Sequence, residues 1–153
     1  MKKLVMIGMI VVVMFGLSGN GFAAEKRGTA AEAEAMVKKA IAMTKAKGKD
    51  AVFTEINNPK GQFTKGDLYV FVYDMSGKVM AHGQNLKMIG KELIDMKDAD
   101  GKEFVKERVE IAKTKGSGWQ EYKFTNPTTK QIEQKRAYVQ RHEDFIFGCG
   151  IYK

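Results

Sequence analysis

The chain has 153 residues, a formal net charge of +8 and a single cysteine. One cysteine excludes an intrachain disulfide, and the lack of a Cys-x-x-Cys-His run excludes an attached c-type haem. The basic residues are dispersed among acidic ones without a dense basic block, which argues against a nucleic-acid partner.

The N-terminus has the layout of a secretory signal peptide. Two lysines precede an apolar run from Leu4 to Leu17, and small residues at positions 23 and 24 follow it. The run is shorter than the roughly 20 apolar residues of a spanning helix, so we expect cleavage after Ala23 and not an uncleaved anchor. The sequence therefore predicts export to the periplasm, a signal peptide at residues 1–23 and one domain at residues 24–153.

Two helices are expected at the start of this domain. From Thr29 to Lys47, apolar residues recur at three- and four-residue spacing and form one face, and Gly48 then ends the helix. A short second helix begins at Asp50 and ends in a turn at residues 57–61.

The pattern then changes to strands. Residues 68–73 are aromatic or branched, as strands prefer, and residues 78–82 can return antiparallel to complete a hairpin. An irregular connection comes next, and then a helix that starts at residues 100–103 and stops near Gly116. Three more strands follow, at residues 119–124, 132–141 and 145–152. Their short connections predict an antiparallel meander, so the expected fold is α+β, with a five-stranded sheet and a long N-terminal helix.

Two strands have informative faces. The strand at 68–73 is apolar on both faces, which predicts a central strand covered on both sides. In the last strand, Gly148 and Gly150 share one face and leave it bare of side chains. Such a gap admits either a closely packed helix or a small ligand, and the sequence leaves both open.

An ordered set of short motifs resembles the single Cache domain family. The residues that carry the resemblance are Tyr69 to Asp74, Ser76 to Val79, Ala81-His82, Gly90, Asp98 to Lys102, Gly118-Trp119, Tyr122, Asn126-Pro127, Lys135, Tyr138-Val139, Gly148 and Gly150 to Tyr152. The resemblance spans nearly all of the chain after the signal peptide. It implies a PAS-like sheet and an extracytoplasmic sensor of chemoreceptors and sensor kinases. The family often has Gly where this chain has Leu68 and Pro where it has Gly83. The chain stops directly after the last strand, as stand-alone exported members do.

Aromatic and cationic side chains are the candidate ligand-binding residues. His82 can donate a hydrogen bond to a carboxylate and titrate near neutrality. Lys135 can clamp a carboxylate, with Arg136 taking its place if the strand faces the other way. Trp119 and Tyr122 offer flat apolar walls, although both also suit an ordinary core. The full set is Phe71, Tyr73, His82, Trp119, Tyr122, Lys135 and Tyr138. Lys135 and Tyr138 differ in strand parity, so a straight strand cannot aim both at one ligand.

Catalytic and metal-binding patterns are missing from the sequence. It has no nucleophile elbow, no glycine-rich phosphate loop and no His-Glu-x-x-His helix. The acidic run from Asp98 to Gly101 suggests a calcium loop, but the twelfth position, where such a loop needs Glu, is Val109. We therefore expect no enzyme activity, no cofactor and no metal.

The expected function is binding of a small organic ligand in the periplasm. The resemblance, together with the positive charge, His82 and Lys135, points to a short carboxylate such as acetate, pyruvate or lactate. The alternative is an interaction module without a ligand that docks on a membrane receptor or sensor kinase. The long helix could also pair two copies in a homodimer.

Overall fold

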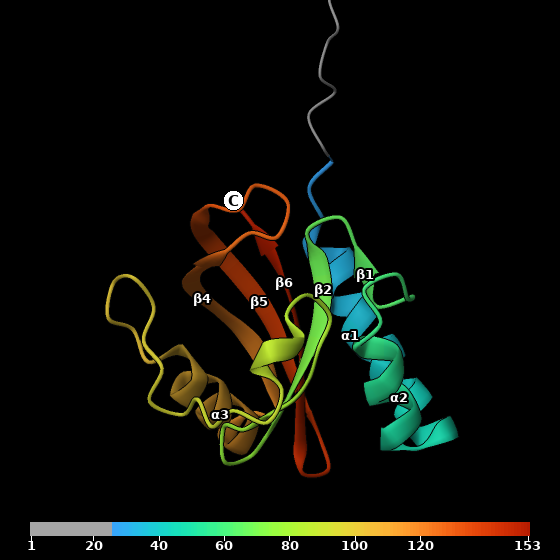
Figure 1. Ribbon diagram of the computed structural model, residues 1–153. Helices are drawn as coiled ribbons and strands as arrows, with labels where there is room; N and C mark the ends of the chain where they lie inside the picture. The colour runs from blue at the N-terminus through green and yellow to red at the C-terminus, as the bar shows by residue number, and fades with distance from the viewer. Residues whose placement is uncertain (1–25) are drawn as a thin grey trace, which may run out of the picture.

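The computed structural model describes residues 26–153, and the predicted signal peptide lies outside this range. Within it, three α-helices, one 3-10 turn and six strands follow one another (Figure 1). In chain order they are α1 (Ala30–Lys47), α2 (Lys49–Ile56), β1 (Thr64–Lys65), β2 (Leu68–Asp74), β3 (Val79–His82), η1 (Leu86–Met88), α3 (Phe104–Thr114), β4 (Ser117–Thr125), β5 (Ile132–His142) and β6 (Phe145–Tyr152).

The strands form one antiparallel sheet with the order β1-β2-β6-β5-β4. β3 pairs with the same edge of β2 as β1 does, but further along that strand: β1 pairs with Leu68 and Tyr69, and β3 pairs with residues 71–73. The prediction of an α+β fold with an antiparallel sheet is confirmed, and the structure adds β1 to the five expected strands. β1 has two residues, Thr64 and Lys65, which carry no apolar pattern.

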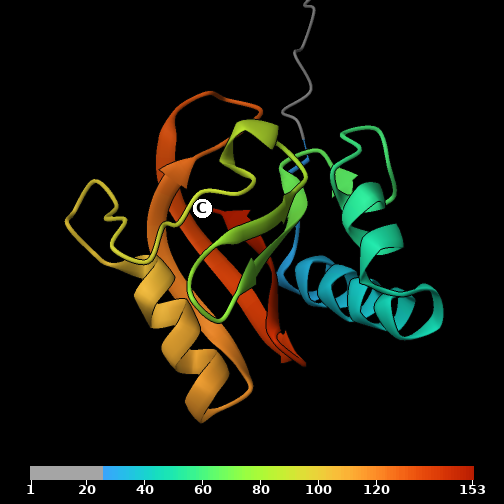
Figure 2. The ribbon, with the colours of Figure 1, turned by 60° about the horizontal axis from the view of Figure 1, so that its bottom comes forward.

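The helices cover both faces of the sheet. Figures 1 and 2 show α1 and α2 on one side, and α3 with the connection at residues 83–103 on the other. β2 is therefore covered on both faces, as its sequence predicts. Leu68, Val70 and Val72 face α1, whereas Tyr69, Phe71 and Tyr73 face the opposite side.

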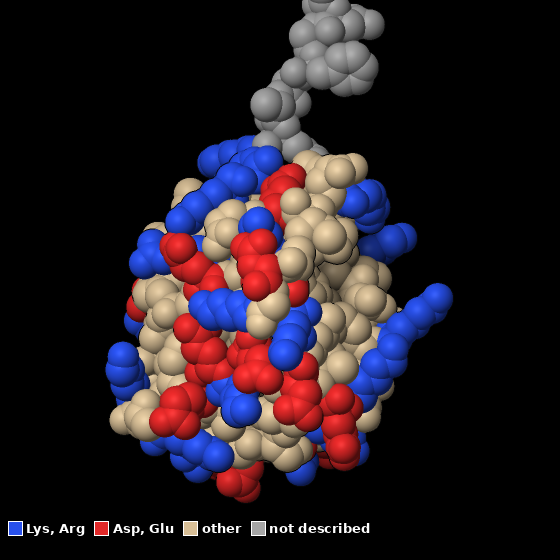
Figure 3. All heavy atoms as spheres, turned by 90° about the vertical axis from the view of Figure 1, so that its left-hand side faces the viewer, with Lys and Arg blue, Asp and Glu red and all other residues tan. Residues whose placement is uncertain are grey.

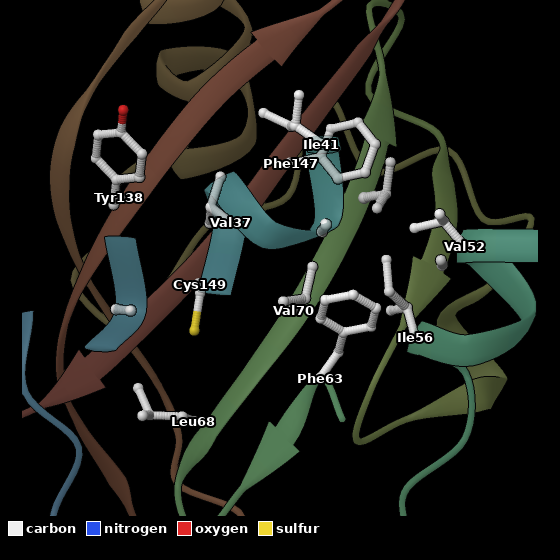
Figure 4. Close-up of a cluster of buried hydrophobic side chains, with 14 residues drawn as sticks. Val37, Ile41, Val52, Ile56, Phe63, Leu68, Val70, Tyr138, Phe147 and Cys149 are labelled. Carbon is white, nitrogen blue, oxygen red and sulfur yellow. The ribbon is translucent and has the colours of Figure 1, made fainter. Parts of the chain in front are cut away.

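The side with α1 and α2 is a continuous apolar core. α1 starts with a capping box, in which Thr29 accepts from the backbone of Glu32 while the Glu32 carboxylate accepts from the backbone of Thr29. Its buried stripe packs against the sheet and α2, as Figure 4 shows. The labelled members are Val37, Ile41, Val52, Ile56, Phe63, Leu68, Val70, Tyr138, Phe147 and Cys149.

A carboxylate joins the connection before α3 to the edge of the sheet. The Asp98 side chain accepts hydrogen bonds from the backbone N–H groups of Asp100 and Lys102, both at 2.9 Å. Its second oxygen accepts from the backbone of Lys123 in β4, also at 2.9 Å. The acidic run therefore acts as an anchor for the loop that leads into α3.

The two glycines of β6 make room for side chains of neighbouring strands. A Cβ on Gly150 would lie 2.4 Å from Cε of Lys135, and a Cβ on Gly148 would lie 2.2 Å from the ring of Phe71. Real Cβ atoms do not approach so closely. Neither alternative from the sequence is correct, because Phe71 and the stem of Lys135 occupy the gap.

Charges of both signs are mixed on the surface. Figure 3, which shows the side with α3 and β4, has lysine and arginine side chains interspersed with aspartate and glutamate. Ion pairs such as Lys102–Glu107 and Lys123–Asp100 lie there. Both signs of charge are thus interspersed over this face.

Candidate functional site

Lys135 lies buried on the sheet face that α3 covers. Its side chain is 0% exposed, and its Nζ donates to the hydroxyls of Tyr69 at 2.8 Å and Tyr152 at 3.2 Å. The ring centroids of Tyr69 and Tyr152 lie 4.1 and 4.8 Å from Nζ, and those of Phe71 and Phe124 lie 5.6 and 5.5 Å away. Within residues 26–153 no carboxylate forms a salt bridge with this ammonium group.

Two of the three N–H bonds of the Lys135 ammonium group have acceptors among the described residues. The Tyr152 hydroxyl donates to the backbone oxygen of Thr125 at 2.8 Å, so it accepts from both Tyr69, at 3.3 Å, and Lys135. Burial raises the pKa of both tyrosines, which therefore stay neutral. An ammonium group has three N–H bonds, and the two phenols take two of them. Within residues 26–153 no third acceptor hydrogen-bonds to Nζ.

Arg108 is a second buried cation on the same side of the sheet. It is 1% exposed and donates to Gln120 Oε1 at 2.9 Å and to the Tyr122 hydroxyl at 3.2 Å. Its guanidinium carbon lies 4.3 and 4.5 Å from the ring centroids of Phe71 and Tyr73. No carboxylate within residues 26–153 forms a salt bridge with it either. The site residues predicted from the sequence do not include Arg108.

A signal for Arg108 was present in the sequence. It follows Phe104 by four residues and precedes Ala112 by four, which places it on the apolar face of α3. An arginine on that face must be buried when the helix packs, and a buried arginine needs polar or aromatic partners.

His82 is held in one tautomer by the backbone that follows it. Its Nδ1 accepts from the N–H groups of Gln84 at 3.2 Å and Asn85 at 3.0 Å, so the ring proton of the neutral form is on Nε2. No group within residues 26–153 hydrogen-bonds to Nε2, which leaves an N–H donor free. Burial, with smaller effects from Lys135 and Arg108, lowers the pKa of His82 to about 3. The expectation that His82 titrates near neutrality is therefore wrong: it stays neutral at physiological pH.

A pocket of about 220 Å³ is lined by His82 and by Tyr69, the hydrogen-bond partner of Lys135. Tyr69 and His82 form part of its wall, with ring centroids 5.0 Å apart, and Phe124 and Thr125 form another part. Tyr69 and Phe124 are two of the rings that surround the Lys135 ammonium group, so the buried cation lies directly behind this wall. The remaining lining residues are Gln84, Asn85, Met88, Pro127 and Lys130. The pocket is smaller than the roughly 300–1,000 Å³ that holds drug-sized ligands, which indicates a small ligand.

The structure brings together most, but not all, of the predicted site residues. His82 lines the pocket and Lys135 lies behind it, while Phe71, Tyr73 and Tyr122 belong to the aromatic layer around the two cations. These residues share the face that α3 covers.

Trp119 and Tyr138 lie on the opposite face of the sheet. They pair across β4 and β5, with ring centroids 5.4 Å apart, and contact the core under α1. Arg136, the alternative to Lys135, stacks on Trp119 at 4.5 Å on that same side. The parity of β5 thus separates Lys135 from Tyr138, and Trp119 and Tyr138 do not line the pocket.

Residues 26–153 show no group of three or more His, Cys, Asp or Glu side chains placed to hold a metal ion. No helix in this range has the length and apolar content needed to cross a membrane. Cys149 is buried in the core under α1, where burial raises its pKa to about 12.

Curated relatives match part of the chain. Over 88 residues it is 33% identical to the sensor histidine kinase MctS of Rhizobium johnstonii and 27% identical to the methyl-accepting chemotaxis protein McpP of Pseudomonas putida. These alignments cover 56% of this chain but 19% and 16% of the two relatives. The relatives are thus much longer signalling proteins that contain a segment similar to this one.

Solved structures share the fold over most of the chain. A methyl-accepting chemotaxis protein from Vibrio parahaemolyticus has a TM-score of 0.70 at 23% identity and covers 80% of this chain and 86% of its own. A Cache chemosensory domain, solved to explain carboxylic acid recognition, has a TM-score of 0.62 at 24% identity and covers 78% and 84%. At these identities the likeness establishes the fold.

The family comparison spans the whole described domain apart from its first two residues. The match to Single Cache domain 2 covers residues 28–153, which include every helix and strand of the structure. The family resemblance seen in the sequence is confirmed: this chain belongs to the Single Cache domain 2 family, whose members are extracytoplasmic sensor domains of chemoreceptors and histidine kinases.

Proposed function

We propose that this protein is a non-enzymatic sensor domain that binds a short organic carboxylate in the pocket beside Tyr69 and His82. The observation that carries the proposal is the pair of buried cations, Lys135 and Arg108, without a carboxylate in salt-bridge distance among residues 26–153. Unpaired buried charge is unfavourable, so an anionic ligand beside these groups is stabilised.

The polar groups beside the pocket suit a carboxylate. His82 in the pocket wall has an Nε2–H donor and the ammonium group of Lys135 lies behind that wall, while a carboxylate has two acceptor oxygens. The Tyr69 and Phe124 rings provide an apolar wall for a short carbon chain. Carboxylic acid recognition by a Cache chemosensory domain of the same fold is in keeping with this ligand class.

A thermal-shift screen tests the proposal. The chain from Ala24 onward is heated with acetate, pyruvate, lactate and, for comparison, amino acids and amines. A ligand at a hundred times its Kd adds roughly 2.7 kcal/mol to the free energy of unfolding, which raises the Tm measurably. We expect at least one short carboxylate to raise the Tm and the amines to have no effect.

Two lysine variants make the screen specific. Lys135→Met removes the buried charge and should abolish the carboxylate-dependent rise. Lys153→Met removes an exposed lysine that pairs with Glu121 on the surface and should preserve it. If no carboxylate raises the Tm of the wild type, ligand binding of this class is refuted. The alternative, docking on a membrane receptor or kinase without a ligand, would then be pursued by cross-linking in the cell envelope.

We also propose that residues 1–23 direct export and that the mature domain begins at Ala24 in the periplasm. The charged, apolar and small-residue layout supports this, as does membership of an extracytoplasmic family. Intact-mass measurement of the protein recovered from a periplasmic fraction should give the mass of residues 24–153. The mass of the full chain would contradict cleavage. A membrane receptor or sensor kinase is the partner that this location favours.

A further inference from the structure

The Lys135 ammonium group has few charged neighbours to stabilise it. Apart from the neutral phenols of Tyr69 and Tyr152, the titratable or charged groups within residues 26–153 that act on it come from four places in the fold. They are His82 at the end of β3, Arg108 in α3, Cys149 in β6 and Asp67 just before β2.

Two of these four neighbours carry no charge near neutral pH. His82 stays neutral because its pKa is about 3, and Cys149 stays a thiol because its pKa is about 12. Asp67 favours the ammonium form, but its Oδ1 accepts from the backbone of Gly28 and it makes no salt bridge with Lys135. Arg108 acts in the opposite direction, because a second cation disfavours the ammonium form.

Burial is the largest effect on the protonation of Lys135. It lowers the pKa of the amine to about 7, and the positive charge of Arg108 acts in the same direction. A carboxylate in the adjacent pocket would reverse this balance, because an opposite charge nearby favours the protonated amine.

On the basis of the proposed carboxylate binding, we propose that the site takes up a proton from solvent when it binds its anion and that Lys135 is the group that receives this proton. The geometry supports this coupling: the amine is enclosed by neutral phenols and aromatic rings beside the pocket, so the bound anion becomes its counter-ion. The protein is thereby a sensor whose response to a carboxylate depends on pH.

The sign of the pH dependence follows from the two protonation states. Below about pH 7 the free protein already holds the proton, so binding needs no uptake. Above pH 7 the free amine is increasingly neutral, while the complex remains protonated. The affinity should therefore be nearly constant near pH 6 and fall, by up to about tenfold per pH unit, as the pH rises from 7.5 to 9.

Isothermal titration calorimetry measures the uptake directly. Acetate, pyruvate and lactate stay ionised throughout this pH range, so a proton taken up must come from the buffer. At pH 8, the binding enthalpy measured in phosphate and in Tris should differ in proportion to the ionisation enthalpies of the two buffers. The slope should approach one proton per ligand, and at pH 6 it should approach zero. Binding at pH 8 with equal enthalpies in both buffers would overturn the inference while leaving carboxylate binding intact.

Lys135→Arg is the matched variant, since a guanidinium stays charged over this range. Whatever its affinity at pH 6, its binding of the carboxylate should show no buffer-dependent heat, and its Kd should stay constant from pH 7.5 to 9. Uptake that persists in this variant would show that another group receives the proton.

A second measurement does not require a variant that folds and binds. The ¹³Cε resonance of Lys135 in the wild type should titrate near pH 7 without ligand and at a higher pH with saturating ligand. The same midpoint in both states would refute the inference. No binding at any pH would refute the proposed carboxylate function, and the inference with it.

Discussion

At the scale of single residues, the glycines of β6 determine where the groups beside the pocket can lie. Gly150 has no side chain, so the stem of Lys135 lies flat against the strand and places its ammonium group between Tyr69 and Tyr152. A side chain at this position would displace Lys135 away from the phenols that hold it.

Gly150→Ala should therefore weaken ligand binding more than the addition of a single methyl group would suggest. Its Cβ would approach Cε of Lys135 to 2.4 Å, and such overpacking typically costs 1–3 kcal/mol. We expect the Kd for a short carboxylate to rise about tenfold or more, measured by calorimetry at pH 6. Gly118→Ala in β4 is the control, because its Cβ meets only a methyl group of Ile111, at 3.0 Å. Unchanged affinity in Gly150→Ala would contradict the positioning role of the glycine.

His82 affects stability in acid. Its pKa falls from 6.5 to about 3 on folding, so between these values the unfolded chain binds a proton that the folded protein does not. Stability from this residue is fully present above pH 6.5 and is lost as the pH falls, by up to about 1.4 kcal/mol per pH unit.

Replacement of His82 by glutamine should flatten this part of the stability curve. Glutamine offers an oxygen to the N–H groups of Gln84 and Asn85 but does not titrate. We expect urea unfolding of His82→Gln to change less between pH 7 and pH 5 than that of the wild type. The chain's other histidine, His142 at the end of β5, provides the control substitution. Equal slopes for the wild type and His82→Gln would refute the assignment.

At the scale of elements, one carboxylate holds the connection before α3 to the edge strand. Asp98 accepts three backbone hydrogen bonds, two from its own loop and one from Lys123 in β4. Hydrogen bonds to a charged acceptor each contribute about 1.5–3 kcal/mol where they are protected from water, and less where, as here, the side chain is partly exposed.

Asp98→Ala should loosen this junction selectively. We expect faster hydrogen exchange at the amides of Asp100, Lys102 and Lys123, whereas the amides of α1 should keep their protection. Asp100→Ala removes an exposed carboxylate that pairs with the Lys123 side chain, and it should leave these exchange rates nearly unchanged. Equal effects of the two substitutions would contradict the anchoring role of Asp98.

The elements themselves were largely predictable from the sequence. Periodicity identified α1 and α3, and β-branched and aromatic runs identified β2 and β6, because these patterns follow from burial on one or both faces. β1 was not predictable, since Thr64 and Lys65 form a strand only because β2 offers them a partner.

The site was only partly predictable. Strand parity separates Lys135 from Tyr138, but parity does not say which face of the sheet has the pocket. Both faces are covered by apolar residues, so the sequence pattern does not distinguish Trp119 from Tyr122 as a wall of the pocket. The space over Gly150 is filled by the Lys135 side chain, and the conformation of this side chain from β5 cannot be read from the sequence of β6.

At the scale of the whole molecule, Lys135 is a destabilising residue in the empty protein. A fully buried cation without a salt-bridge partner among residues 26–153 lowers the free energy of unfolding. Since its pKa is lowered from 10.5 to about 7, the unfolded chain binds an extra proton between these values, and the stability of the wild type rises with pH there.

Lys135→Met should therefore stabilise the unliganded protein. Methionine would place an unbranched, uncharged side chain among the rings that surround Nζ, those of Tyr69, Phe71 and Phe124. Replacing buried charged groups by apolar ones can add about 1–4 kcal/mol to the free energy of unfolding. We expect a higher Tm than the wild type at pH 6 and a smaller difference at pH 9. A lower Tm at pH 6 would show that the hydrogen bonds of the ammonium group outweigh its burial.

Trp119 is an intrinsic fluorescence probe for conformational changes on the face of the sheet under α1. It is the chain's single tryptophan, and it lies with Arg136 on the face under α1, across the sheet from the pocket. Filling of the pocket alone should leave its fluorescence unchanged. An emission shift on addition of a carboxylate would mean that binding changes the conformation on the α1 side of the sheet. The rate of this shift in stopped-flow fluorescence would give the rate of that conformational change.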